Sequence, residues 1–225
     1  MADSSNLRGL AAVAVLAGGV LLAPSASAAE AFPVFALPFE AGQQVSSAGI
    51  HSDNGTSGVK NALDLSPRDG LVRAPLAGTV RLQHCDGGDW VTIDHAGGWR
   101  TGYYHLERIA VTDGQAVEPG ALLGETGNAL PCGGSSSGAH VHFTLWTLPD
   151  GTARSADALD AGNWDGLSYG QVHSRIAESH GEPVDGKEFG GWRFTEGTTQ
   201  YSGVATRVAD GEAVQLPGRF RYEAE

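Results

Sequence analysis

The stretch "GTVRLQHCDGGDWVTIDHAGGWRTGYYHL", residues 78–106, decides the expected fold. It contains three runs rich in β-branched and aromatic residues, which strands favour, and glycine-containing turns separate them. Short strands that follow one another at this spacing are typical of antiparallel sheets. The stretch therefore predicts neighbouring antiparallel strands. Their expected bounds are residues 78–85, 89–95 and 99–106.

The same pattern continues toward the C-terminus. Residues 116–127 carry Pro-Gly and Thr-Gly pairs, which mark tight turns. Residues 190–194 and 201–216 read as further strands, and Asp210-Gly211 within the second is a hairpin signal. The sequence thus predicts an all-β fold with mainly antiparallel sheets.

Little helix is expected. Residues 168–179 favour one short helix, which Gly170 weakens, and residues 132–138 form a polar loop rich in glycine and serine. The chain has 225 residues and shows no internal repeat. We expect a single domain over residues 29–225, with a core at 45–150 and a C-terminal β extension at 151–225.

The N-terminal segment 1–28 reads as a signal peptide. Arg8 precedes an apolar run over residues 9–23, Pro24 ends the run, and small residues follow at 26–28. The alternative is a membrane anchor, but the run is shorter than the ~20 residues that span a bilayer. The sequence therefore predicts export to the cell exterior, with no membrane attachment after cleavage.

The net charge bears on the binding partners of the chain, and the cysteines bear on its covalent structure. A net charge of −12 argues against nucleic acid as a partner. The chain has two cysteines, Cys85 and Cys132, and an even pair in an exported chain predicts one disulfide. The alternative, metal binding by these cysteines, lacks the usual Cys-x-x-Cys spacing.

The stretch "GAHVHFTLW", residues 138–146, places two histidines two positions apart. On a strand, His140 and His142 would project from the same face, about 7 Å apart. Phe143 and Leu145 would then point the opposite way, into a core. The pair could bind a metal and supply a base, or it could be two surface histidines on a polar face.

Upstream, "GIHSDNGTSGVKNALDLS" at 49–66 adds His51, in an expected glycine- and serine-rich loop, and Asp64. Asp64 stands between two leucines on an expected strand, where an uncompensated charge is costly. A metal ion would compensate it; the alternative is a turn aspartate before Pro67.

His51, Asp64 and one of the two later histidines would provide two nitrogens and one oxygen. Zinc favours such a set, and three protein ligands leave a fourth position for water. Zinc makes water nucleophilic near neutral pH, so the implied reaction is amide hydrolysis. His105 could lie beside the metal and stabilise an oxyanion or carry a proton; the alternative is an ordinary core or surface histidine.

With these residues assembled, the chain resembles the lysostaphin-type, or LytM-domain, zinc endopeptidases. It is most similar to the branch that includes staphylolysin and the beta-lytic endopeptidases. The resemblance covers residues 45–147 strongly and the rest of the mature chain loosely. The stretches that carry it are 49–66, 78–129 with its tyrosine-rich approach to His105, 138–146, "FGGWRF" at 189–194 and "QYSGVATR" at 200–207.

The resemblance assigns a role to each position. It implies that His51, Asp64 and His142 hold one Zn²⁺ and that His105 and His140 form the catalytic pair. It also implies an antiparallel β fold with a groove, acting as a secreted monomer on peptide cross-links of bacterial peptidoglycan at glycine or D-alanine bonds. Ala139 departs from the family pattern, in which proline often precedes the histidine pair.

Two other functions fit less well. One is a catalytically inactive module that binds the cell wall or activates another hydrolase, but such proteins lose zinc ligands. The other is a zinc carboxypeptidase specific for D-alanyl-D-alanine. Those enzymes have a short gap between the first two ligands, whereas a long segment separates His51 from Asp64 here.

Overall fold

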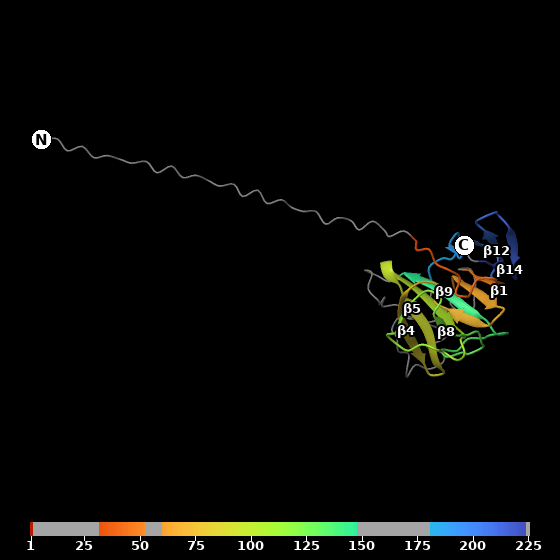
Figure 1. Cartoon of the computed structure of the whole chain (residues 1–225), viewed down its shortest axis with the longest axis horizontal. Coiled ribbons are helices and arrows are strands. Elements are labelled where there is room, and N and C mark those ends of the chain that lie inside the picture. Colours follow the sequence, from red (N-terminus) through yellow and green to blue (C-terminus); the bar gives the residue numbers. More distant parts are fainter. Residues whose placement is uncertain (2–31, 53–59, 148–180, 224–225) are drawn as a thin grey trace. The chain divides into compact units, whose positions relative to one another are not determined.

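The computed structural model describes Met1 and residues 32–52, 60–147 and 181–223 (Figure 1). Residues 32–225 form one compact unit. The expected signal peptide after Met1, the expected helix at 168–179, and His173 and His180 lie outside the described residues. Within the described part of the chain, no helix is long and apolar enough to cross a bilayer.

The expected all-β fold with antiparallel sheets is confirmed, and the secondary structure over the described residues consists of strands and one 3-10 turn. Every pair of neighbouring strands is antiparallel. The elements are β1 Gln43–His51, β2 Ala62–Pro67, β3 Leu71–Arg73, β4 Gly78–Cys85, β5 Gly88–Asp94, the 3-10 turn Ala96–Gly98, β6 Trp99–Tyr104, β7 Ala116–Val117, β8 Leu122–Glu125, β9 Val141–Thr147, β10 Glu188–Phe189, β11 Trp192–Glu196, β12 Gly203–Arg207, β13 Ala213–Leu216 and β14 Gly218–Tyr222.

The main sheet has eight strands in the order β14-β1-β2-β9-β6-β5-β4-β7. Strand β9 therefore lies between β2 and β6, although these strands are far from it in the sequence (Figure 1). The other sheets of the described residues are a four-stranded sheet, β10-β11-β12-β13, and the pair β3-β8.

The opening stretch forms β4, β5 and β6 as the sequence predicts. Val80 pairs with Ile93, and Leu82 pairs with Val91, so apolar residues oppose one another across β4 and β5. Strand β6 ends at Tyr104, two residues before its expected end. The reason is His105, whose φ of 69° turns the chain out of the extended conformation.

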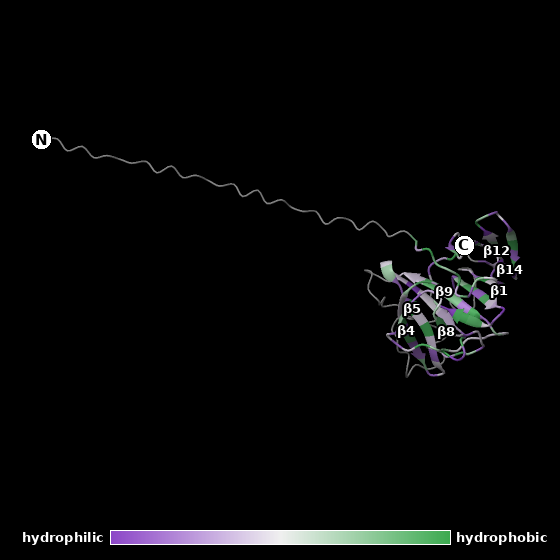
Figure 2. Cartoon of the chain, viewed as in Figure 1, coloured by the Kyte–Doolittle hydropathy of each residue, from purple (hydrophilic) through white to green (hydrophobic). Residues whose placement is uncertain are grey.

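The core lies on one face of β9 and its neighbours. Phe143 and Leu145 are fully buried, so their expected orientation is confirmed. The Phe143 ring lies 5.6 Å from the Tyr103 ring on β6 and 5.5 Å from the Phe189 ring on β10. Figure 2 shows hydrophobic residues along the central strands of this sheet. Phe143 thus connects the two larger sheets.

The C-terminal strands also contribute to the main sheet. The Asp210-Gly211 signal falls in the connection between β12 and β13, which is an antiparallel hairpin as predicted. Strand β14 then pairs with β1 at the sheet edge, and its Phe220 ring lies 4.7 Å from the Trp192 ring.

The expected loop at His51 is wrong, because His51 is the last residue of β1. The sequence of β1, QQVSSAGIH, consists largely of small and polar residues, which give a weak strand signal. Its pairing with β2 and β14 supplies the backbone hydrogen bonds that its composition does not indicate.

Cys85 and Cys132 form a disulfide, the pairing that the sequence predicts, with Cα atoms 5.1 Å apart. Both cysteines are buried. The bond joins the end of β4 to the loop between β8 and β9 across 47 residues of chain.

We expect the double variant Cys85→Ser/Cys132→Ser to lose stability. Closing a loop of this length restricts the unfolded chain and stabilises the fold by about 4 kcal/mol in the loop-entropy model. Urea unfolding of the variant and of the oxidised wild type measures the difference. The same unfolding midpoint in both proteins would contradict the expectation.

Candidate metal centre and active site

Three neighbouring strands bring His51, Asp64 and His142 together. In the register of β2 and β9, Asp64 lies directly opposite His142. In the register of β1 and β2, His51 pairs with Ala62, two residues from Asp64 and on the same face. The three side chains therefore project from one side of the sheet.

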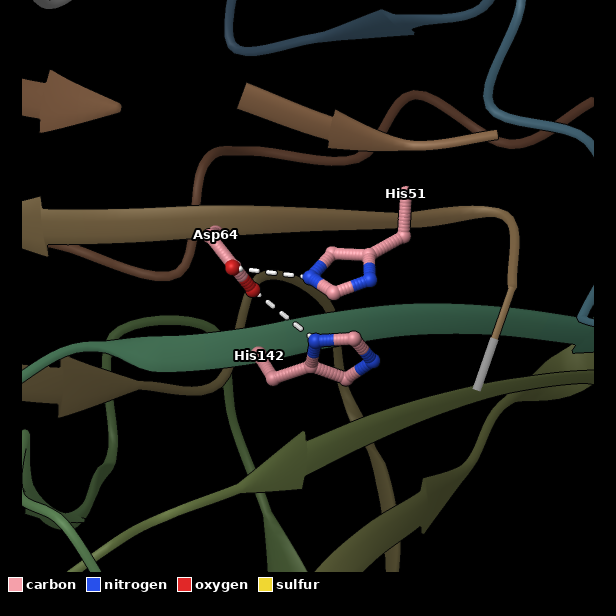
Figure 3. Close-up of side chains that lie close together, drawn as sticks. All are labelled: His51, Asp64 and His142. Carbon is pink, nitrogen blue, oxygen red and sulfur yellow. Dashed lines mark hydrogen bonds and ion pairs between the residues drawn. The ribbon is translucent and has the colours of Figure 1, made fainter. Parts of the chain in front are cut away.

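Their distances are those of direct contact (Figure 3). Nε2 of His51 lies 2.9 Å from Oδ2 of Asp64, and Nδ1 of His142 lies 2.8 Å from Oδ1. The two imidazole rings approach edge to face, with centroids 4.5 Å apart. Both imidazoles thus donate to the same carboxylate, one to each oxygen.

Because the Asp64 carboxylate is buried, its negative charge is stabilised by the two histidines rather than by water. Asp64 is 6% exposed, and its neighbours Leu63 and Leu65 are fully buried on the opposite face. Burial alone would raise the pKa of Asp64, but the hydrogen bonds from His142 and His51 outweigh it and hold the pKa well below its ordinary value. Burial lowers the pKa of His142, which favours the neutral imidazole. The site therefore combines an ionised carboxylate with a neutral imidazole.

This donor set fits a zinc ion. One atom from each residue can be chosen so that all three lie within 4.8 Å of one another, and all three residues are buried. Around a tetrahedral zinc with ligands at about 2.0–2.2 Å, ligand atoms lie about 3.3 Å apart. A cation here would take the place of the two protons that the imidazoles now share with Asp64.

His140 and His105 lie beside this cluster. Nε2 of His140 is 3.5 Å from Oδ1 of Asp64, so His140 faces the same side as His142 although it precedes β9. The ring of His105 lies 4.6 Å from the ring of His140 and 6.2 Å from that of His142. The structure thus brings together all five residues singled out in the sequence.

Backbone carbonyls fix the orientation of these two histidines. Nδ1 of His105 donates to the carbonyl of Ala129 at 2.9 Å, and Nδ1 of His140 donates to that of Gly138 at 2.7 Å. A carbonyl can only accept, so Nδ1 of each ring carries a proton, and the neutral form of either ring has its lone pair at Nε2. Burial lowers the pKa of His105 to about 4.

Sequence reasoning gave no role to two residues that contact His51. The Tyr201 ring lies 4.8 Å from the His51 ring, and Nε2 of Gln200 lies 3.5 Å from His51 Nδ1. Both residues come from the loop between β11 and β12. No local pattern indicates this contact, because the partners lie far apart in the sequence. Gly49 permits it, since a Cβ there would lie 2.1 Å from the Tyr201 carbonyl oxygen.

Two other described histidines are engaged elsewhere. His84 bonds to Asp89 at the β4–β5 hairpin. His95 is buried and bonds to Thr101 and to the Ala77 carbonyl. Within the described part of the chain, the cluster around Asp64 is the one group of residues spaced to hold a metal.

A scan against family models matches residues 58–156 to Peptidase family M23. The chain contains an M23 peptidase domain. Peptidases of this family are metal-dependent hydrolases, and the matched segment includes Asp64, His105, His140 and His142. His51 lies before the matched segment.

Curated relatives align with about half of this chain or less. Protease LasA of Pseudomonas aeruginosa is 39% identical over 121 residues, which are 48% of this chain and 28% of the relative. The Beta-lytic metalloendopeptidase of Lysobacter enzymogenes is 32% identical over 119 residues, 48% of this chain and 66% of the relative. The Peptidoglycan DD-endopeptidase ShyA of Vibrio cholerae is 37% identical over 77 residues, 34% of this chain and 16% of the relative. The chain therefore spans under a third of the length of LasA.

Among solved structures, the deep-sea M23 metalloprotease pseudoalterin has the same fold. The TM-score is 0.60 at 24% identity, over 85% of this chain and 99% of the other. This likeness covers a larger share of the chain than the segment that the family model matches.

The lowered pKa of His105 predicts a pH dependence of stability in the metal-free M23 domain. The unfolded chain binds a proton at this histidine near pH 6.5, whereas the folded protein binds it only near pH 4. The stability contributed by neutral His105 is therefore complete above pH 6.5 and is lost as the pH falls to about 4. Across that window we expect wild type to lose about 1–3 kcal/mol more than His105→Asn, in urea unfolding with a chelator present.

Asparagine suits this comparison because it does not titrate and it tolerates the left-handed conformation of position 105. Equal pH slopes for the two proteins would contradict the assignment of this loss to His105.

Proposed function

We propose that the chain is an exported zinc metalloendopeptidase that hydrolyses peptide cross-links of bacterial peptidoglycan. The observation that carries the proposal is the convergence of His51, Asp64 and His142 on one point, with His105 and His140 beside it. The site fits the metal dependence of the M23 family, and the signal-peptide pattern over residues 1–28 supports export.

His51, Asp64 and His142 would hold the zinc ion. When bound, zinc acts as a Lewis acid toward a peptide carbonyl and lowers the pKa of water to near neutrality. The protein would supply three ligands and leave one position open, the arrangement of catalytic rather than structural zinc sites. The fully buried leucines beside Asp64 hold its strand in register.

His140 is the proposed general base. Its Nε2 lone pair lies on the metal side, 3.5 Å from Asp64, and the bond from Nδ1 to the Gly138 carbonyl prevents the ring from turning away. A proton taken from water at Nε2 would make this ring cationic. The Gly138 carbonyl and the Asp64 carboxylate both stabilise that charge.

His105 is the proposed oxyanion stabiliser or proton donor. Its ring is only 4.6 Å from that of His140, so two positive charges on these rings would repel each other. In neutral His105 the lone pair is at Nε2, because Nδ1 donates to Ala129. Nε2 would therefore first take up the proton that water gives to His140, and the cationic ring would then donate it to an oxyanion or a departing amine.

The substrate assignment rests on the family resemblance and on the named relatives. The ShyA relative is by name a peptidoglycan endopeptidase, and the Lysobacter relative is by name a metalloendopeptidase. Glycine- or D-alanine-containing bonds are the proposed cleavage sites, and a monomer is the proposed active form. The inactive alternative, a cell-wall-binding or hydrolase-activating module, has less support because all five positions carry competent side chains.

The first prediction from this proposal concerns zinc. We expect His51→Ala, Asp64→Ala and His142→Ala to lose bound zinc, because each variant removes one of three ligands. Metal analysis of the purified proteins measures occupancy, and near-UV circular dichroism checks that each variant is folded. Full zinc occupancy in a folded Asp64→Ala protein would refute the ligand assignment.

A second prediction concerns turnover. We expect His105→Ala and His140→Ala to retain zinc and to cleave about 10²–10⁴-fold more slowly, the usual contribution of general acid–base catalysis. The assay incubates zinc-loaded protein with muropeptides of different cross-bridge types and identifies the new termini by mass spectrometry.

The matched control is His84→Ala, which removes a histidine that bonds to Asp89 at the hairpin and not to the site. It should keep both zinc and turnover. Zinc-loaded wild type that cleaves none of the muropeptides would favour the inactive alternative.

A further inference from the structure

The adjacent tyrosines Tyr103 and Tyr104 lead into His105, and the proposed mechanism uses neither. Tyr103 points into the core, is fully buried, and bonds through its hydroxyl to Thr101 at 2.6 Å. Tyr104 lies on the other face and is half-buried, with its ring 5.7 Å from the ring of Trp90. The two tyrosines therefore have separate surroundings on one strand.

The Tyr104 hydroxyl bonds twice to the loop between β8 and β9. It accepts a hydrogen bond from the Cys132 N–H at 2.7 Å and donates one to the Gly133 carbonyl at 2.9 Å. One hydroxyl thus satisfies a donor and an acceptor of the same loop backbone.

The same loop supplies the carbonyl that orients His105. Nδ1 of His105 donates to Ala129, three residues before Cys132. The left-handed φ of His105 brings its ring beside that of Tyr104, with centroids 4.7 Å apart. The end of β6 and the loop are therefore joined through two adjacent side chains, one hydroxyl and one imidazole.

Other contacts of the loop tie it to the β4–β5 hairpin. The disulfide joins Cys132 to Cys85, and the Gly87 N–H donates to the Pro131 carbonyl at 2.9 Å. These contacts fix the loop relative to the hairpin. The Tyr104 hydroxyl instead fixes it relative to β6, one residue from His105, where an error in position would act directly on the imidazole.

We propose that Tyr104 is a positioning residue: its hydroxyl holds the 129–133 loop so that the Ala129 carbonyl keeps the proton of His105 on Nδ1 and its lone pair at Nε2. This inference rests on the proposed peptidase function, in which Nε2 of His105 faces the reacting groups. The hydrogen bond made by one imidazole nitrogen decides which nitrogen carries the proton. Movement of the carbonyl away from Nδ1 by about 1 Å would break that bond, since N–H···O hydrogen bonds have separations of about 2.7–3.2 Å.

The test is Tyr104→Phe in the full chain loaded with zinc. The ring remains against Trp90 and His105, and only the hydroxyl is lost. Imidazole ¹⁵N NMR reports which His105 nitrogen is protonated, and the His105→Asn spectrum assigns the signal.

We expect wild type to carry the His105 proton on Nδ1 and the Tyr104→Phe variant to show both tautomers. We also expect the variant to have a kcat about tenfold lower on muropeptides, with KM and zinc occupancy unchanged, because an interaction specific to the transition state is lost.

Tyr103→Phe is the matched control. It removes a hydroxyl from the neighbouring tyrosine of the same strand, where the lost partner is Thr101 and not the loop. We expect it to lower stability while leaving the His105 tautomer and kcat as in wild type.

The positioning role is overturned if Tyr104→Phe keeps the wild-type tautomer and kcat, or if both tyrosine variants shift His105 alike. Wild type without activity on any muropeptide would instead overturn the proposed function. In that case the ¹⁵N spectra would still decide the role of Tyr104, because the tautomer is read without turnover.

Discussion

The buried carboxylate of Asp64 is the constraint on which the rest of the site depends. Its strand neighbours, Leu63 and Leu65, are fully buried on the core face, so the alternation of β2 directs Asp64 to the opposite face. A carboxylate with 6% exposure and no partner would cost several kcal/mol. His51 and His142, one from each flanking strand, offset that cost in the metal-free protein. The register of β2 therefore determines whether the Asp64 charge is compensated, since a shift of one residue would move Asp64 into the core.

The elements that the sequence predicts best are those in which alternation is strong. Strands β4, β5 and β6 and the orientation of Phe143 follow from the pattern of apolar and β-branched residues, and the position of Asp64 between leucines indicates an unusual charge. These signals are local. They require only that neighbouring residues on a strand point to opposite faces, and this alternation does not depend on the tertiary structure.

The features that sequence reasoning missed are those that depend on distant pairing. Strand β1 has a composition close to that of a loop, and one of its two partners is β14, the last strand of the fold. For this reason His51 was expected in a loop although it ends a strand. The contact of Tyr201 with His51 has the same origin, since it requires the β11–β12 loop to return to β1. The residue in β1 that reflects this contact is Gly49, which has a φ of 121° and no room for a Cβ against Tyr201.

The five proposed site residues differ in how the backbone holds them. His51, Asp64 and His142 lie on paired strands, where ladder hydrogen bonds fix their positions relative to one another. His105 and His140 lie just outside β6 and β9, and each is oriented by one backbone carbonyl. A metal tolerates little error in the spacing of its ligands, whereas a group that transfers protons must have the correct ring nitrogen directed at the reacting atoms. Placing the proposed ligands within the sheet and the proposed catalytic pair at strand ends meets both requirements on one surface, and it makes the loop that supplies one of those carbonyls part of the proposed active site.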